Sequence, residues 1–174
     1  MPARTLLCLL MTLSSLSAIE IGEKLPPLKG EFLTGREAVL PAAAQGKPAL
    51  LAIGFTYKSR FAVEEWVKHF RADFDKEPRA TFFEVPIIGG MAKMGKWFID
   101  SGMRRGTPKA DHEHVVTVYN EAGEWKKRLN FKEPDAAYMV LLDKDGAVAW
   151  RFTGGYDAAK YAECAAKLKS LLNP

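Results

Sequence analysis

The arrangement of apolar residues between positions 48 and 172 constrains the fold more than any other feature of the sequence. Short runs of branched and aromatic residues alternate with longer segments in which apolar residues recur every three or four positions. This is the pattern of buried strands followed by amphipathic helices. The order is βαβαβαββα. The expected strands cover residues 48–55, 81–88, 114–120, 136–143 and 147–154, and the expected helices cover residues 60–76, 91–103, 122–129 and 157–172.

The last two strands are joined by the sequence Lys144-Asp145-Gly146. Asp-Gly between two strand-like runs is a strong signal for a β-hairpin. Strands connected by helices form a parallel sheet, to which the hairpin adds antiparallel strands, with a C-terminal helix packed behind them. The sequence therefore predicts a three-layer α/β domain over residues 48–174.

The N-terminal residues 1–18, MPARTLLCLLMTLSSLSA, differ from the rest of the chain. Arg4 precedes an apolar stretch over residues 6–16, and small residues follow it. This is the pattern of a secretory signal peptide, and the stretch is shorter than the ~20 residues of a comfortable membrane span. We therefore expect a periplasmic or secreted protein in which residues 19–47 form an N-terminal extension. The alternative is an uncleaved segment that anchors the protein to a membrane.

Composition limits the classes of function. A chain of 174 residues with 48% hydrophobic and 26% charged residues fits one globular domain. Its 25 basic residues stand against 21 acidic ones, giving a net charge of +4. This bias is too mild to indicate binding to nucleic acid, which we do not expect as a partner.

The cysteine count decides which redox chemistry is open to the chain. There are 2 cysteines, and Cys8 lies in the expected signal peptide, which leaves Cys164 as the thiol of the mature protein. One thiol cannot form a disulfide within the chain. Tyr161, Cys164 and Leu168 share a helical face, so we expect Cys164 to be a buried core residue.

The turn GFTYKSR at residues 54–60 links the first strand of the domain to its first helix. With this turn, residues 48–172 resemble the thioredoxin-like fold, in the redoxin variant that carries an inserted βα unit. The resemblance places the paired redox cysteines at Ser59 and Ala62 and the cis-proline of the fold near Ala137, so both features are absent. We expect a trans peptide bond before Ala137, because a cis bond without proline costs ~2.5–4 kcal/mol.

The serines and histidines are the remaining candidates for catalytic chemistry. Ser59 has no GxSxG setting, and we expect it to be the N-cap of the following helix. His112 and His114 are two apart on an expected strand and would point to one face, where they could share a metal ion. No third ligand is apparent. We therefore expect no cofactor and no enzymatic activity; a one-cysteine redoxin or a metal-dependent oxidoreductase of the same fold is the main alternative.

Two segments, residues 91–109 and 123–132, carry an excess of basic over acidic side chains. Such a basic and aromatic surface suits anionic lipid headgroups or an acidic protein segment. The alternative is that the charges solvate the helix faces while the aromatic residues fill the core. The aromatic residues in these segments are Trp97, Phe98, Trp125 and Phe131.

The segments RRGTPKADHEHVVTVY and AAYMVLLDKDGAVAWRFTGG carry a second resemblance. They are similar to the family of assembly factors that chaperone subunit a of the ATP-synthase Fo sector in mitochondria. That family has a thioredoxin-like fold without the paired cysteines, and it acts inside the organelle, whereas this chain carries an export signal. The resemblance implies an assembly factor or chaperone for a membrane complex such as ATP synthase. The matching positions are Arg104, His114, Tyr138, Leu141, Asp143, Gly146, Trp150, Gly154 and Gly155.

Together these features predict an exported, non-redox, thioredoxin-like domain that binds a protein client, such as a subunit of a membrane complex, and an anionic membrane surface. In this fold the inserted unit lies beside the end of the sheet that carries the turn. Basic and aromatic residues from both are therefore expected to form one rim. The expected partner-binding residues are Tyr57, Lys58, Arg60, Phe61, Arg104 and Arg105.

Overall fold

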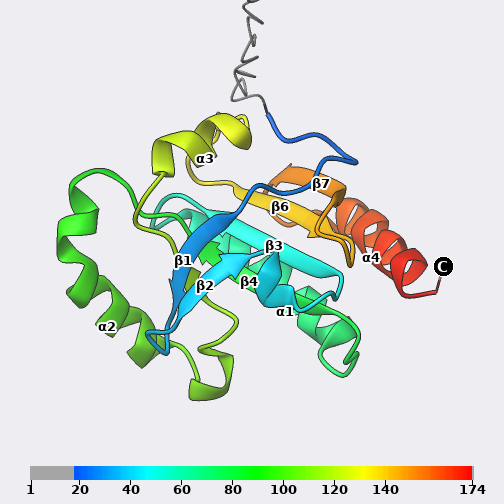
Figure 1. Ribbon diagram of the computed structural model, residues 1–174, viewed down its shortest axis with the longest axis horizontal. Coiled ribbons are helices and arrows are strands. Elements are labelled where there is room, and N and C mark those ends of the chain that lie inside the picture. The colour runs from blue at the N-terminus through cyan, green and yellow to red at the C-terminus, as the bar shows by residue number, and fades with distance from the viewer. Residues whose placement is uncertain (1–17, 174) are drawn as a thin grey trace, which may run out of the picture.

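The computed structural model describes residues 18–173, so the expected signal peptide lies outside the described residues apart from Ala18. At the centre is a four-stranded sheet in the order β4-β3-β6-β7 (Figure 1). β3 and β4 run parallel, whereas β6 and β7 are added antiparallel. The bounds are β3 (Ala49–Gly54), β4 (Thr81–Pro86), β6 (Ala137–Leu142) and β7 (Val148–Gly154).

Two helices, α1 (Ser59–Phe74) and α4 (Ala158–Leu172), cover one face of this sheet. Trp66 is fully buried at the centre of this layer, and its indole N–H donates to the carbonyl of Gly155 at 3.1 Å. Cys164 packs in the same cluster of buried residues, as its position on the apolar stripe of α4 predicts. Burial raises the pKa of its thiol to about 12.

The opposite face is covered by a second sheet, in the order β2-β1-β5, and by the short helix α3 (Ala122–Arg128). β1 (Leu28–Phe32) and β2 (Glu37–Leu40) form an antiparallel hairpin, and β5 (Val116–Thr117) pairs with the other edge of β1. Leu28 and Leu40 are completely buried against the central sheet. The N-terminal extension therefore supplies much of one layer, and the expected three-layer α/β fold is confirmed.

The strand expected over residues 114–120 is much shorter in the structure. β5 pairs with β1 over only two residues and touches β4 through isolated bridges, so it joins the two sheets at a crossing. The crossing needs a close approach of the two chains at Gly30. A Cβ atom there would lie 2.6 Å from the carbonyl oxygen of Thr117, which only glycine avoids.

The inserted unit follows β4 as a 3₁₀ segment, η2 (Gly90–Gly95), the helix α2 (Lys96–Gly106) and a 3₁₀ turn, η3 (Lys109–Asp111). In Figure 1, α2 lies at one edge of the molecule beside β1 and β2, and α4 lies at the other. Within residues 18–173, the helices are too short or too polar to cross a membrane. The peptide bond before Ala137 is trans, as expected; the cis bond found among the described residues is Leu40–Pro41.

Glu84 is a carboxylate in an unfavourable position on β4. Burial, together with the nearby carboxylates of Glu64 and Asp111, raises its pKa from the ordinary value of 4.5 to about 7, against the opposing effect of Arg71. The folded protein therefore holds a proton on Glu84 at pH values where the unfolded chain has lost it. Between pH 4.5 and 7 the folded state binds more protons, so this group makes stability fall as the pH rises.

We predict that Glu84→Gln removes this part of the pH dependence. The variant should be more stable than the wild type at pH 8 by about 3 kcal/mol, since one pKa unit corresponds to ~1.4 kcal/mol, and of similar stability at pH 4. Urea unfolding at both pH values measures the difference. Equal stability of the two proteins at pH 8 would show that the Glu84 carboxylate is ionised without cost.

Candidate binding site at the turn after β3

The turn after β3 is held by a reciprocal pair of hydrogen bonds between Thr56 and Ser59. The Ser59 hydroxyl accepts from the Thr56 N–H at 3.1 Å, and the Thr56 hydroxyl accepts from the Ser59 N–H at 3.0 Å. This is the arrangement of a capping box, in which two side chains satisfy each other's backbone at the start of a helix. The role of Thr56 was not predicted, although its Thr-x-x-Ser spacing in the sequence is a signal for it.

Ser59 is completely buried, and its hydroxyl also donates to the Thr56 carbonyl at 2.8 Å. The prediction that it is the N-cap differs from the structure by one residue, because α1 begins at Ser59 and Lys58 precedes it. A buried hydroxyl that is already bonded to backbone groups is not placed to attack a substrate. A Cβ atom at Gly54 would lie 2.6 Å from the Ser59 hydroxyl oxygen, so glycine is needed where the strand ends.

The reciprocal hydrogen bonds between Thr56 and Ser59, which we call the Thr56–Ser59 lock, hold a turn that presents four basic and aromatic side chains to solvent. We call these four side chains the turn cluster. Tyr57 is 72% exposed and Phe61 is 56% exposed, and their rings meet edge to face with centroids 6.2 Å apart. The guanidinium of Arg60 lies over both rings, 4.7 Å from the centroid of Tyr57 and 4.8 Å from that of Phe61. Lys58 completes the cluster, so the structure brings together four of the six residues expected in the partner surface.

The electrostatic character of the turn cluster is positive. Lys58 lies 3.9 Å from Asp135 and Arg60 lies 3.8 Å from Glu64, and all four side chains are exposed, so these ion pairs contribute little. No acidic residue occupies the first turn of α1. The helix dipole adds partial positive charge at the same end. The cluster therefore favours an acidic ligand that also offers apolar surface.

Hydrogen bonds connect the turn cluster to the loop that precedes β6. The Thr56 hydroxyl reaches the neighbouring loop, lying 3.1 Å from the Pro134 carbonyl oxygen and 3.0 Å from an Asp135 carboxylate oxygen. That loop is fixed in turn by the hydroxyl of Tyr138, which accepts the N–H groups of Lys132 and Glu133. The loop stands beside Ala137, the position where the resemblance places a cis-proline.

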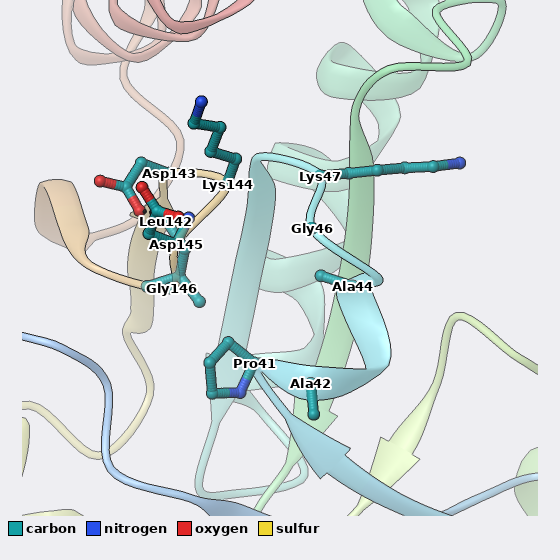
Figure 2. Close-up of a pocket in the computed structure, with 10 residues that line it drawn as sticks. All are labelled: Pro41, Ala42, Ala44, Gly46, Lys47, Leu142, Asp143, Lys144, Asp145 and Gly146. Atoms are coloured by element: carbon teal, nitrogen blue, oxygen red, sulfur yellow. Dashed lines mark hydrogen bonds between the residues drawn. The ribbon is translucent and has the colours of Figure 1, made fainter.

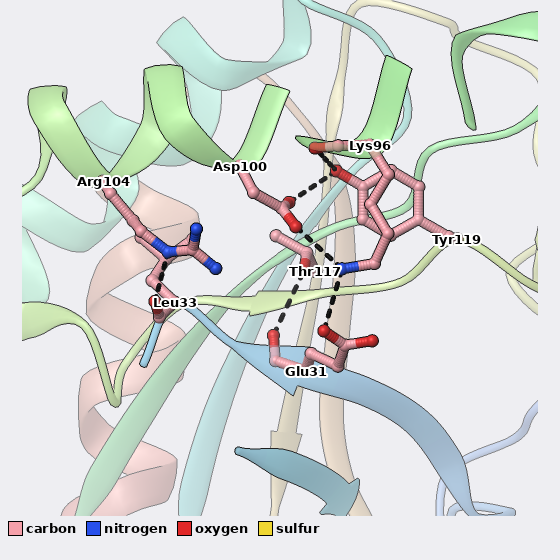
Figure 3. Close-up of polar contacts among 7 residues, drawn as sticks. All are labelled: Glu31, Leu33, Lys96, Asp100, Arg104, Thr117 and Tyr119. Carbon is pink, nitrogen blue, oxygen red and sulfur yellow. Dashed lines mark hydrogen bonds and ion pairs between the residues drawn. The ribbon is translucent and has the colours of Figure 1, made fainter. Parts of the chain in front are cut away.

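Arg104 and Arg105 lie far from the turn cluster along α2. The Nε of Arg104 donates to the carbonyl of Leu33 at 2.6 Å, just beyond the end of β1 (Figure 3). The Leu33 N–H in turn donates to the carbonyl of His112, at the amino end of β5. β5 runs parallel to β4, whereas the turn cluster follows the carboxyl end of β3. The expected single rim is therefore divided between two ends of the sheet.

The two candidate metal ligands do not form a pair. His112 and His114 lie in the turn after η3 rather than on a strand, because β5 begins only at Val116. The His112 Nε2 lies 3.0 Å from the Thr107 carbonyl oxygen, and the His114 Nδ1 lies 2.9 Å from that of Phe82. One nitrogen of each ring is therefore engaged by a backbone carbonyl. Among the described residues no group of three or more His, Cys, Asp or Glu side chains is arranged to hold a metal ion.

A small pocket lies at the other end of the central sheet, between the 3₁₀ turn η1 (Ala42–Ala44) and the β6–β7 turn (Figure 2). Its volume is about 140 Å³. The Asp143 carboxylate accepts the N–H groups of Asp145 and Ala147, so it stabilises the hairpin turn. Figure 2 shows Lys47 pointing away from that turn. The polar groups here serve the turn and do not converge on the pocket.

Comparison with known proteins supports the fold. No family model matches the sequence, and no curated protein matches it. Solved structures do resemble it, and three of them have TM-scores of 0.58 or 0.59. A protein assigned as thiol:disulfide interchange protein DsbE from Chlorobium tepidum has a TM-score of 0.59 at 16% identity, over 90% of this chain and 100% of that one. BsSco, a member of the Sco family of cytochrome c oxidase assembly proteins, has 0.59 at 13%, over 88% and 96%. Thiol peroxidase from Chromobacterium violaceum has 0.58 at 13%, over 88% of each chain.

These similarities place the chain in the thioredoxin-like fold and correct one expectation. Most of the similar structures are thiol:disulfide oxidoreductases and peroxidases, which are enzymes. The prediction that the chain is not an enzyme is therefore wrong. It had been inferred from the missing cysteine pair. Resemblance to the ATP-synthase assembly factors is not shown by the comparisons.

We predict that the Thr56–Ser59 lock, and not the turn cluster, contributes to stability. Ser59→Ala removes the buried hydroxyl that accepts the Thr56 N–H, which should lower the free energy of unfolding by ~0.5–2 kcal/mol, the cost of losing a capping side chain. Arg60→Ala removes only exposed contacts and should change it by less than about 0.5 kcal/mol. Urea unfolding with unchanged m-values checks both. A neutral Ser59→Ala, or an Arg60→Ala of equal cost, would contradict this division of roles.

Proposed function

We propose that this protein binds a segment of a client protein at the turn cluster and acts in the assembly of a membrane complex. The observation that carries the proposal is the Thr56–Ser59 lock, which presents Tyr57, Lys58, Arg60 and Phe61 outward at the turn where redoxins hold their cysteines. A rigid scaffold that displays exposed aromatic and arginine side chains has the composition of a binding hot spot.

The chemistry of the cluster indicates the kind of client. Arg60 and Lys58 favour carboxylates, and the rings of Tyr57 and Phe61 favour apolar side chains beside them. A client segment that carries acidic residues next to aromatic or aliphatic ones fits this surface. An assembly role is consistent with the similarity to BsSco, whose family assembles cytochrome c oxidase, and the sequence resemblance suggests a subunit of ATP synthase as the client. The signal-peptide pattern of residues 1–18 supports a role outside the cytoplasm.

A second candidate is an oxidoreductase of the same fold, which the peroxidase and interchange proteins among the similar structures favour. Its thiol would be Cys164, the free cysteine of the described residues. That thiol is buried and its pKa is raised to about 12, so little thiolate is present at neutral pH. Insulin reduction or peroxide consumption that disappears in Cys164→Ser would favour this candidate over client binding.

The experiment that tests the proposal places a photo-crosslinking amino acid at position 57 of the full chain, expressed in its native host. We predict a crosslinked client, identified by mass spectrometry, whose yield falls about tenfold when Arg60→Glu is added, since a charge reversal in a binding hot spot costs 1 kcal/mol or more. The matched control is Lys167→Glu on the exposed face of α4.

Two outcomes would contradict client binding at the turn cluster. One is a crosslinked product whose yield is the same with Arg60→Glu and with Lys167→Glu. The other is the absence of any crosslinked protein from position 57 when the probe at an exposed α4 position captures one. Circular dichroism of each variant confirms that the fold is retained in the comparison.

A further inference from the structure

The segment η2–α2 exposes an unusual amount of apolar surface. Four large side chains are largely open to solvent: Met91 (83%), Met94 (82%), Trp97 (79%) and Phe98 (70%). Their spacing places them along one side of the segment. The expectation that the aromatic residues of the basic segments fill the core holds for Trp125, which is 1% exposed, and fails for Trp97 and Phe98.

The reason is that α2 is docked by its polar side. The buried carboxylate of Asp100 accepts from the Lys96 ammonium at 2.8 Å and from the Tyr119 hydroxyl at 2.6 Å (Figure 3). The same ammonium donates to Glu31 on β1 at 2.8 Å. One turn further, Arg104 binds the Leu33 carbonyl. Lys96, Asp100 and Arg104 are four residues apart, so these polar contacts lie on one face of α2.

Basic groups continue the exposed apolar face. Arg105 follows Phe98 by seven residues, which puts it on the same side of the helix, and it is exposed. Lys109 is exposed in η3. Among residues 18–173 no carboxylate lies within ion-pair distance of either side chain. The outer face therefore combines large apolar side chains with unpaired positive charge.

We propose that the outer face of η2–α2 docks the protein on the surface of an anionic lipid bilayer. Met91, Met94, Trp97 and Phe98 enter the interfacial region, where tryptophan is favoured, and Arg105 and Lys109 meet the lipid headgroups. The inference goes beyond client binding, because it uses a different element and a different partner.

Three features favour a bilayer as the occupant. The apolar side chains are carried by a segment at the edge of the molecule (Figure 1). Met94 also lines a groove beside the β1–β2 hairpin, but the other residues that line this groove are mostly polar or charged, whereas an amphipathic peptide needs an apolar groove. The positive charge complements anionic headgroups. The polar face is already fixed on β1 and Tyr119, so the helix needs no folding step when it reaches the membrane.

The tryptophans allow a direct test on the full chain. The sequence has 4 tryptophans, and residues 1–17 contain none. Trp66 and Trp125 are buried and Trp150 is partly buried against Trp66, which leaves Trp97 as the exposed one. The protein is titrated with phosphatidylcholine vesicles that contain phosphatidylglycerol and brominated acyl chains, which quench only tryptophan within the bilayer. We expect quenching that is lost in Trp97→Phe.

Variants that keep Trp97 test whether the outer face of η2–α2 is the part that binds the bilayer. Met94→Ser with Phe98→Ser should raise the lipid concentration needed for half-maximal quenching about tenfold, because buried apolar area is removed. Arg105→Gln with Lys109→Gln should raise it about fivefold per charge, and high salt should act in the same direction. The matched controls, Tyr57→Ser with Phe61→Ser and Lys167→Gln with Lys169→Gln, should leave it unchanged.

Three results would overturn the proposal. Trp97 that is not quenched by brominated lipid excludes insertion, even when the protein sediments with vesicles through its N-terminal segment. A Trp97 emission that shifts with protein concentration in the absence of lipid assigns the face to a second copy of the chain. The third result is quenching that Tyr57→Ser with Phe61→Ser abolishes but Met94→Ser with Phe98→Ser does not. This would place the membrane contact at α1. Failure of these tests leaves client binding at the turn cluster intact.

Discussion

The buried carboxylate of Asp100 determines the orientation of the helix that distinguishes this molecule. It is 4% exposed, and a charge at such a position must be compensated by close partners. Lys96 supplies the opposite charge and Tyr119 a short hydrogen bond. Burial, together with this hydrogen bond, raises the pKa of the Tyr119 hydroxyl. Turning α2 by half a revolution would bury its apolar side but break this network and leave polar groups unpaired on both sides.

The two exposed surfaces have a common construction. In each, short polar contacts on the inner side fix the backbone, and large apolar and basic side chains face solvent. At the turn after β3 the inner contacts are those of Thr56 and Ser59, and on α2 they are those of Lys96 and Asp100. Side chains on such supports lose little conformational entropy when a partner binds. This arrangement is consistent with the client binding and the membrane docking that we propose.

Much of the fold follows from the sequence, because the central strands and helices are long and strongly periodic. The second sheet was harder to foresee: β1 and β2 are short strands whose partner β5 provides only two residues. The side of α2 that faces the protein was not predicted either, since periodicity identifies an apolar face without stating where it points. The spacing of Lys96, Asp100 and Arg104 was the available signal. His112 and His114 were misplaced because the η3 turn replaces the start of the expected strand.

The most direct test of this account is the accessibility of Trp97 in the free protein, measured by acrylamide quenching of tryptophan fluorescence in the wild type and in Trp97→Phe. The account predicts a red-shifted, strongly quenched component in the wild type that is missing from the variant, since Trp97 is 79% exposed while Trp66 and Trp125 are buried. A blue-shifted emission that resists quenching and is unchanged by Trp97→Phe would contradict it, because α2 would then pack its apolar face against the protein.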